Sequence, residues 1–265
     1  MMTSDSHKYL KSTVEDGRLN ITLNRPEKRN ALNKILVDEL KSVLKWSLSV
    51  KDIRTIIIRG AGKAFCSGAD LEYLKELKGY SRQENIQDSL SLADLYYQIY
   101  SHPKPVIAAV DGPALAGGCG LASVCDFIIA TDNARFGYPE VKIGFVAALV
   151  SVFLIRQVGE RKARELLLTG KIISAKEAVD IGLINKLVSV PALDKSIDEL
   201  AGELGMNSSM AISTSKQLLS GFTFGDIESE LNRTANINAG FRETEDFIEG
   251  IQAFIEKRKP KWILS

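Results

Sequence analysis

Short apolar runs alternate with longer amphipathic stretches over the first two-thirds of the chain. Four runs rich in β-branched residues predict strands, at Leu19–Leu23, Thr55–Arg59, Val106–Val110 and Phe127–Ala130. Between the first two runs, Asn33–Ser49 repeats apolar residues at helical spacing and predicts a helix. Strands that alternate with helices indicate βαβ units. We therefore expect an α/β protein with a mostly parallel sheet and right-handed crossovers.

Helix starts are marked by serine followed three residues later by glutamate. Ser81 with Glu84 predicts a helix through about Tyr100, and Ser174 with Glu177 predicts another. After Pro191 the strand signals stop. Four helices are predicted there, at Leu193–Leu204, Ser208–Leu219, Ile227–Asn238 and Thr244–Lys257. The chain thus divides into an α/β part, residues 1–191, and a helical part, residues 192–265.

Composition and charge narrow the class of protein. Of 265 residues, 45% are hydrophobic and 25% charged, which suits a chain able to bury a sizeable core. Lys and Arg number 34 against 33 Asp and Glu, so the net charge of +1 argues against nucleic acid as the main partner. Three cysteines without a C-x-x-C pair indicate reduced thiols. The polar start Met1–Lys11 and the absence of a membrane-length apolar run predict a soluble, cytoplasmic protein.

Histidine chemistry has little support, but two glycine-containing turns follow predicted strands. The two histidines, His7 and His102, have no zinc-ligand spacing, so we expect no metal site. The turns, Gly62–Leu71 and Asp111–Gly120, match no phosphate-binding motif. Glycine allows a ligand to approach the backbone closely, and free N–H groups at a helix start near Gly117 favour negative charge. Two such donors on one oxygen form an oxyanion hole. Alternatively, each segment is only a tight turn.

Segments along nearly the whole chain, from about Ile21 to Lys259, resemble the crotonase (enoyl-CoA hydratase/isomerase) superfamily. In order, they are Ile21–Asn33, the two glycine turns, Phe136–Glu140, Glu165–Lys171 with Glu177–Asn185, and Phe254–Lys259. The resemblance implies a crotonase-like spiral of ββα units over residues 1–191. It also implies that residues 192–265 form a helical region through which copies of the chain assemble, as a trimer or a dimer of trimers. The implied substrate is an acyl-CoA thioester, with no cofactor other than the coenzyme A of the substrate.

The resemblance also assigns roles to single residues. The N–H groups of Ala69 and Gly117 would form the oxyanion hole, and Glu140 would be the acid/base. Coenzyme A would contact the first loop through Lys63, Ala69, Asp70 and Leu71, and would also contact Lys257, reaching in from a neighbouring subunit. Asp70 would mainly hold its loop. Removing a proton α to a thioester needs a base beside that carbon and stabilisation of the enolate oxygen, which these groups would supply. On sequence alone, Glu140 could instead be an ordinary solvated turn residue.

Two departures from the family pattern leave the reaction open. Hydratases of the family carry a second glutamate three residues past the oxyanion glycine, where this chain has Gly120. Phe145–Val150 replaces a proline and a glycine-rich turn, which predicts a bulkier, more apolar pocket wall. Adding water is easiest with two carboxylates, whereas moving a double bond needs one base. An enoyl-CoA hydratase-like enzyme and a single-glutamate Δ3,Δ2-enoyl-CoA isomerase therefore both remain, beside an RNA-binding or scaffolding member with little catalysis.

The thiols of Cys66 and Cys119 lie inside the two site loops. No histidine is near either of them in sequence to generate a thiolate, and small residues suit tight turns. We therefore expect both cysteines to be structural rather than nucleophilic.

Overall fold

The larger of two sheets carries all four strands predicted from the sequence. The computed structural model describes residues 7–222 and 226–262. The order of this six-stranded sheet is β1-β2-β3-β4-β6-β9. Its strands are β1 Leu10–Glu15, β2 Arg18–Leu23, β3 Thr55–Gly60, β4 Val106–Val110, β6 Phe127–Thr131 and β9 Lys186–Val188. Each neighbouring pair is parallel except β1 with β2, so the prediction of a mostly parallel sheet is confirmed.

A second, three-stranded sheet has strands too short for any periodicity to predict. It consists of β5 Pro113–Leu115, β7 Arg135–Gly137 and β8 Ile172–Ser174, in that order. β5 and β7 are parallel, and β7 and β8 are antiparallel. The chain passes from β4 to β5 and from β6 to β7, so successive turns alternate between the two sheets. This alternation is the spiral that the resemblance implied.

Two of the helices begin at the capping boxes that the sequence predicts. The helices of the first two-thirds are α1 Lys34–Ser49, α2 Leu71–Leu77, α3 Arg82–Tyr100, α4 Gly117–Ser123, α5 Ala148–Thr169 and α6 Ala175–Asp180. Short 3-10 turns are η2 Pro26–Lys28, η3 Pro139–Ile143 and η4 Val190–Ala192. Ser81 and Glu84 form a reciprocal capping box at α3, and Ser174 and Glu177 form another at α6. Both predicted capping boxes are confirmed, because such signals depend on only four consecutive residues.

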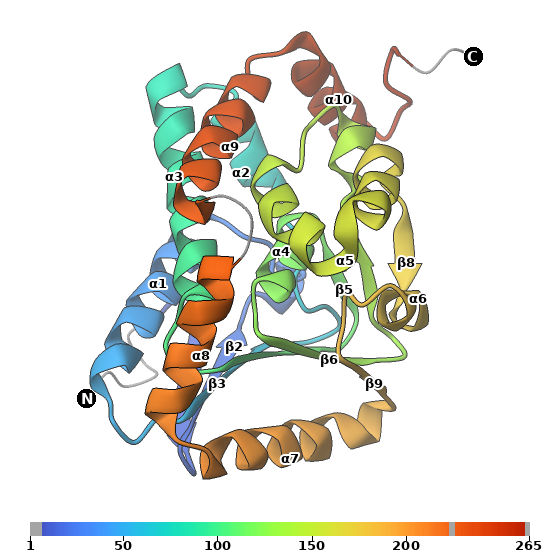
Figure 1. Ribbon diagram of the computed structural model, residues 1–265. Coiled ribbons are helices and arrows are strands. Elements are labelled where there is room, and N and C mark those ends of the chain that lie inside the picture. Colours follow the sequence, from blue (N-terminus) through green and yellow to red (C-terminus); the bar gives the residue numbers. More distant parts are fainter. Residues whose placement is uncertain (1–6, 223–225, 263–265) are drawn as a thin grey trace.

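The larger sheet is buried on both faces, which explains its nearly continuous apolar strands. Ile57, Ile107 and Ile129 pack against Ile197 and Ala201 of α7 Leu193–Met206. The alternate side chains of β3, β4 and β6 enter the main core on the other face. Figure 1 shows α7 lying across one face of the sheet and α4 and α5 on the opposite side.

The four helices predicted after Pro191 are all present, but they differ in how they pack. They are α7, α8 Ser209–Phe222, α9 Ile227–Phe241 and α10 Glu245–Ile255. α9 runs alongside α3 and adds buried residues to the main core (Figure 1). α10 packs against η3 and α2. Around α8, Met206, Met210 and Leu219 are 83%, 80% and 66% exposed, so apolar surface is left uncovered there. Assembly through this region stays a prediction.

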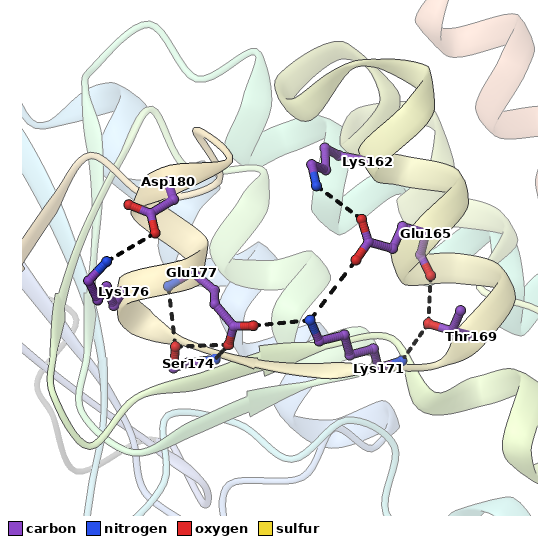
Figure 2. Close-up of polar contacts among 8 residues, drawn as sticks. All are labelled: Lys162, Glu165, Thr169, Lys171, Ser174, Lys176, Glu177 and Asp180. Atoms are coloured by element: carbon purple, nitrogen blue, oxygen red, sulfur yellow. Dashed lines mark hydrogen bonds and ion pairs between the residues drawn. The ribbon is translucent and has the colours of Figure 1, made fainter.

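The family-like segment from Glu165 to Glu177 forms a surface joint between α5 and α6 (Figure 2). Lys171 Nζ lies 3.0 Å from Glu177 Oε1 and 4.0 Å from Glu165 Oε1. Thr169 Oγ1 accepts the N–H of Lys171, and Glu177 caps α6 through Ser174. These contacts stabilise the turn from α5 into β8. This segment of the chain therefore has a structural role. Among residues 7–222 and 226–262, no helix has the length and apolarity needed to cross a bilayer.

Candidate active site

Three successive turns of the spiral meet at one edge of the smaller sheet. Cys66 forms a parallel bridge with Ala114 of β5, and β5 pairs in parallel with β7. Because the carboxyl ends of parallel segments lie at the same edge, the residues that follow them come together. These are Gly68–Asp70, Ala116–Gly117 and Tyr138–Glu140. Leu115 N donates to Cys66 O at 2.9 Å, and Ala116 N donates to Gly137 O at 2.8 Å.

A buried ion pair connects the first loop to the N-terminal segment Ile21–Asn33, which resembles the family. Arg25 Nη2 lies 2.6 Å from Asp70 Oδ2, and the side chains are only 5% and 4% exposed. Asp70 also caps α2 by accepting the N–H of Glu72. Burial alone would raise the pKa of Asp70, but the Arg25 guanidinium and the Glu72 N–H lower it below its ordinary value. Asp70 is therefore an ionised anchor for this loop.

Asn30 fastens the same loop from beneath. Its Nδ2 donates to the carbonyls of Ala61 and Ala64, each at 2.8 Å, and its Oδ1 accepts the N–H of Arg25. These roles of Arg25 and Asn30 were not predicted from the sequence, although both residues lie in the segment that resembles the family. Their partners are distant in sequence, so only the fold reveals them.

The N–H groups of Ala69 and Gly117 both lack an acceptor within residues 7–222 and 226–262. On either side of Ala69, Leu32 N donates to Gly68 O and Asp70 N donates to Leu32 O. Gly117 is the first residue of α4, so its N–H lies outside the helical ladder. Among the residues that the structure describes, neither N–H donates a hydrogen bond. A Cβ built on Gly68 would lie 3.6 Å from Gly117 N, so the two loops are in contact.

Ala116 is strained, and the strain sets the direction of the second loop. Its φ of 50° and ψ of −129° are unfavourable for a residue with a Cβ. Its N–H donates to Gly137 O, and its carbonyl accepts the N–H of Gly120 at 3.0 Å. Strain of this kind persists only where neighbouring bonds enforce it, and it is common at functional sites.

Glu140 has the properties of a proton carrier. It lies in η3 directly after Pro139 and is 7% exposed. Its Oε2 is buried without a hydrogen-bond partner in the described structure. Burial raises the pKa of Glu140 to about 7. A carboxyl group that titrates near neutral pH can both accept and return a proton. Glu140 is thus a buried group rather than the solvated turn residue that the sequence also allowed.

Position 120 has no room for a side chain. A Cβ built on Gly120 would lie 2.3 Å from Val150 Cγ1 and 3.0 Å from Tyr96 Oη. Val150 therefore fills the space beside Gly120, and Phe145 packs against Phe247 with the rings tilted and 5.1 Å between their centroids. An apolar pocket wall over Phe145–Val150 stays a prediction. Tyr96 was not predicted from the sequence as a residue of the site. Its only signal was the missing side chain at Gly120.

The other residues of the predicted site lie on the surface around these turns. Lys63 is exposed in the first loop. Leu71, at the start of α2, is 43% exposed. Lys257 is exposed in the turn that ends α10, with a φ of 55°. Since α10 packs against η3 and α2 of the same chain, its end belongs to the same side of the molecule as these elements.

Cys66 and Cys119 are protonated thiols at neutral pH, and His102 is a buried neutral imidazole, so none of them suits nucleophilic catalysis. Cys66 and Cys119 are buried and free, and burial raises their pKa values to about 12 and about 11. His102 lies between α1 and β4, where its Nε2 is 3.1 Å from Ser47 Oγ. Burial lowers the pKa of His102 to about 4, so it is neutral at pH 7.

The comparisons with known proteins agree with this architecture. A family model described as enoyl-CoA hydratase/isomerase matches residues 13–263, and the chain belongs to this family of enzymes. A Thermus thermophilus protein, provisionally assigned as an enoyl-CoA hydratase, is 42% identical, covering 94% of this chain and 99% of its own. The crotonyl-CoA hydratase of Syntrophomonas wolfei is 37% identical, over 91% and 92% of the two chains. The crystal structure of an enoyl-CoA hydratase/isomerase from Xanthobacter autotrophicus superposes with a TM-score of 0.88 at 30% identity, covering 95% and 94%.

Proposed function

We propose that this enzyme acts on acyl-CoA thioesters through one acid/base, Glu140, and an oxyanion hole formed by the N–H groups of Ala69 and Gly117. The observation that carries the proposal is the buried, unpartnered Oε2 of Glu140, at the edge where both loops end. Two free N–H groups can hold the thioester oxygen as negative charge develops on it. The unpartnered carboxylate oxygen is then available to the proton on the α carbon.

The proton balance of the reaction needs only this one carboxyl group. In double-bond migration, Glu140 removes a proton from the α carbon of a 3-enoyl-CoA, and the electron pair moves onto the thioester oxygen. The resulting dienolate takes the same proton back at the γ carbon, which gives the 2-enoyl-CoA. In hydration, Glu140 takes a proton from water as the hydroxyl adds to the β carbon, and returns it to the α carbon.

The coenzyme A part of the substrate is proposed to lie over the first loop. The exposed ammonium group of Lys63, and that of Lys257 from a neighbouring subunit, would supply positive charge for its phosphates, and half-exposed Leu71 would supply apolar contact. Asp70 contributes by holding the loop in place. Copies of the chain are proposed to assemble as a trimer or a dimer of trimers through the apolar surface around α8.

Hydration and double-bond isomerisation are the two candidate reactions. Hydration is supported by similarity to proteins named as hydratases, including the crotonyl-CoA hydratase of Syntrophomonas wolfei. Δ3,Δ2 isomerisation is supported by a specific observation, namely that position 120 holds neither a second carboxylate nor space for one. Both candidates share the oxyanion hole and Glu140.

Turnover of 2-enoyl-CoA and 3-enoyl-CoA by wild type and Glu140→Gln tests the proposal. A well-placed base contributes about 10²–10⁴-fold in rate, so Glu140→Gln should lose turnover on that scale while its affinity for a saturated acyl-CoA is retained. Glu177→Gln, at an exposed carboxylate of the surface joint, is the matched control and should keep its turnover. Formation of 3-hydroxyacyl-CoA identifies hydration, and conversion of 3-enoyl- to 2-enoyl-CoA identifies isomerisation. Full activity in Glu140→Gln would refute the assignment.

A further inference from the structure

A buried tyrosine reaches from α3 to the first turn of α4. Tyr96 is fully buried, and its Oη donates to Gly117 O at 2.7 Å. Its ring meets Phe153 edge to face, with 6.4 Å between centroids. The carbonyl that it holds therefore belongs to the residue whose N–H is one of the two free donors of the site.

The same phenol occupies the space next to Gly120. A Cβ at Gly120 would come within 3.0 Å of Tyr96 Oη and 3.2 Å of Tyr96 Cζ, while Val150 closes the other side. A Cβ at Gly117 would lie 3.2 Å from the same Oη. Tyr96 thus lies between the oxyanion glycine and the position where hydratases of the family carry their second carboxylate.

We infer that Tyr96 is a positioning residue, whose hydroxyl fixes the carbonyl of Gly117 and which, with Val150, fills the place of the second carboxylate. The inference rests on the proposed function, because the N–H of Gly117 matters only if it holds a thioester oxygen. The role assigned to Tyr96 is to position the backbone, which differs from the acid/base role of Glu140.

The need for such a residue follows from the backbone on either side of Gly117. Gly117 has no Cβ, so its own dihedral angles are soft. The preceding residue, Ala116, is held in a strained conformation that would relax if its neighbours allowed it. The hydrogen bonds from Ala116 N and Gly120 N fix the strained residue, and the Tyr96 hydroxyl fixes the peptide after Gly117. An oxyanion donor works only when it is aimed before the charge develops.

The phenol is not a second proton carrier. Its hydrogen is committed to the Gly117 carbonyl, and burial raises the pKa of Tyr96 well above its ordinary value. Burial raises the pKa of Glu140 to about 7, so this carboxyl can exchange a proton at neutral pH where the phenol cannot. The side chain at position 96 therefore governs how well the enolate is stabilised, without taking part in the proton transfer.

Tyr96→Phe separates this role from a merely structural one. We expect kcat to fall about 10-fold, equivalent to about 1.4 kcal/mol, with KM changed less than about twofold. Affinity for a 3-ketoacyl-CoA, which binds as an enolate, should fall by the same factor, while affinity for the saturated acyl-CoA should not. Tyr100→Phe is the matched control, because Tyr100 is one helical turn away and also packs on Phe153. It should leave all four quantities unchanged.

The filled position is tested by stability, independently of turnover. Gly120→Ala should lower the thermal midpoint, and Val150→Ala in the same chain should restore part of the loss by removing the nearest contact. An unchanged midpoint in Gly120→Ala would overturn the inference.

The failure of the inference is distinguishable from that of the proposed function. Loss of turnover in Glu140→Gln, with unchanged kcat and enolate affinity in Tyr96→Phe, overturns the role of Tyr96 alone. Full turnover in Glu140→Gln overturns the acid/base of the proposed function, and a lowered enolate affinity in Tyr96→Phe would then still support the role of Tyr96.

Discussion

Glycine has opposite functions in the site turns and in the helices after Pro191. A Cβ on Gly112 would lie 2.2 Å from Lys63 O, and one on Gly118 would lie 2.1 Å from Cys66 O. In α7, by contrast, nothing lies within 4 Å of a Cβ on Gly202 or Gly205. The site turns need glycine because successive turns of the spiral bring backbone against backbone. In α7 glycine only weakens a helix. The comparison shows that the constraint lies in the spacing between turns of the spiral.

Alanine at one glycine of each region should give the largest contrast. Gly118→Ala should lower the free energy of unfolding by at least about 3 kcal/mol, because a carbonyl rather than a mobile side chain must move. It should also lower turnover by separating the two loops. Gly202→Ala should raise the free energy of unfolding by about 0.5–1 kcal/mol, since alanine favours the helix. Urea unfolding and turnover of both variants measure this. Equal stability of the two would show that the spiral tolerates wider spacing.

A second contrast concerns carboxylates and should be visible as a pH dependence of stability. Burial raises the pKa of Glu140 from 4.5 in the unfolded chain to about 7. The contribution of the protonated carboxyl to the free energy of unfolding is fully present below about pH 4.5. It is lost as the pH rises through about 7, and the loss is about 3 kcal/mol. Glu140→Gln should therefore be more stable than wild type at pH 8 and equally stable at pH 4.5. Unfolding curves at the two pH values check this, and identical pH profiles would contradict the burial of the charge.

Activity should depend on the same pKa of Glu140, but it should rise with pH where stability falls. Because the base must be ionised, kcat/KM should rise with pH up to about 7 and then level off. Turnover measured across this range in wild type and Glu177→Gln should give the same midpoint. A midpoint near 4.5 would mean that the carboxylate is solvated in the working enzyme.

The apolar surface around α8 allows a test that leaves the site turns untouched. Leu219→Glu places a charge where side chains are 66–83% exposed, so the single chain should fold normally. If copies assemble through this surface, sedimentation should show a smaller species. Gln217→Glu adds the same charge at an exposed polar position of α8 and is the control. An unchanged sedimentation coefficient in Leu219→Glu would remove α8 from the proposed interface.

The smallest effect is expected at Cys66. Cys66→Ser keeps the size of the side chain, and the thiol is protonated at neutral pH in any case. Turnover per folded molecule should therefore change by no more than about twofold. Loss of turnover in a normally folded Cys66→Ser enzyme would show that the thiol has a chemical role.

What the sequence predicted correctly depends on neighbouring residues. The four long strands, the capping boxes at Ser81 and Ser174 and the helices after Pro191 are local signals, and all are present. The three-residue strands of the smaller sheet were missed, since their register is set by parallel pairing with distant turns. β1 was also missed, because Leu10–Glu15 is an edge strand with little burial and is held mainly by pairing with β2.

The candidate site divides in the same way. The segments containing Ala69, Gly117 and Glu140 were located by their resemblance to the motifs of the family. The contacts of Arg25, Asn30 and Tyr96 could not be, because each side chain bonds to a residue whose position only the fold supplies. A missing side chain at Gly120 indicates that something else fills its place, but it does not say what.

Among the glycines after Pro191 that the structure describes, Gly250 of α10 is the exception, and it ties a helix that is synthesised late to the site. A Cβ there would lie 2.1 Å from Ile143 O, in the 3-10 turn that also holds Glu140. At ribosomal rates of about 5–20 residues per second, α10 emerges roughly 5–20 seconds after that turn. Until then the turn with Glu140 has no backing helix. A nascent or truncated chain that lacks α10 should accordingly be catalytically inactive, even where its two sheets have already formed.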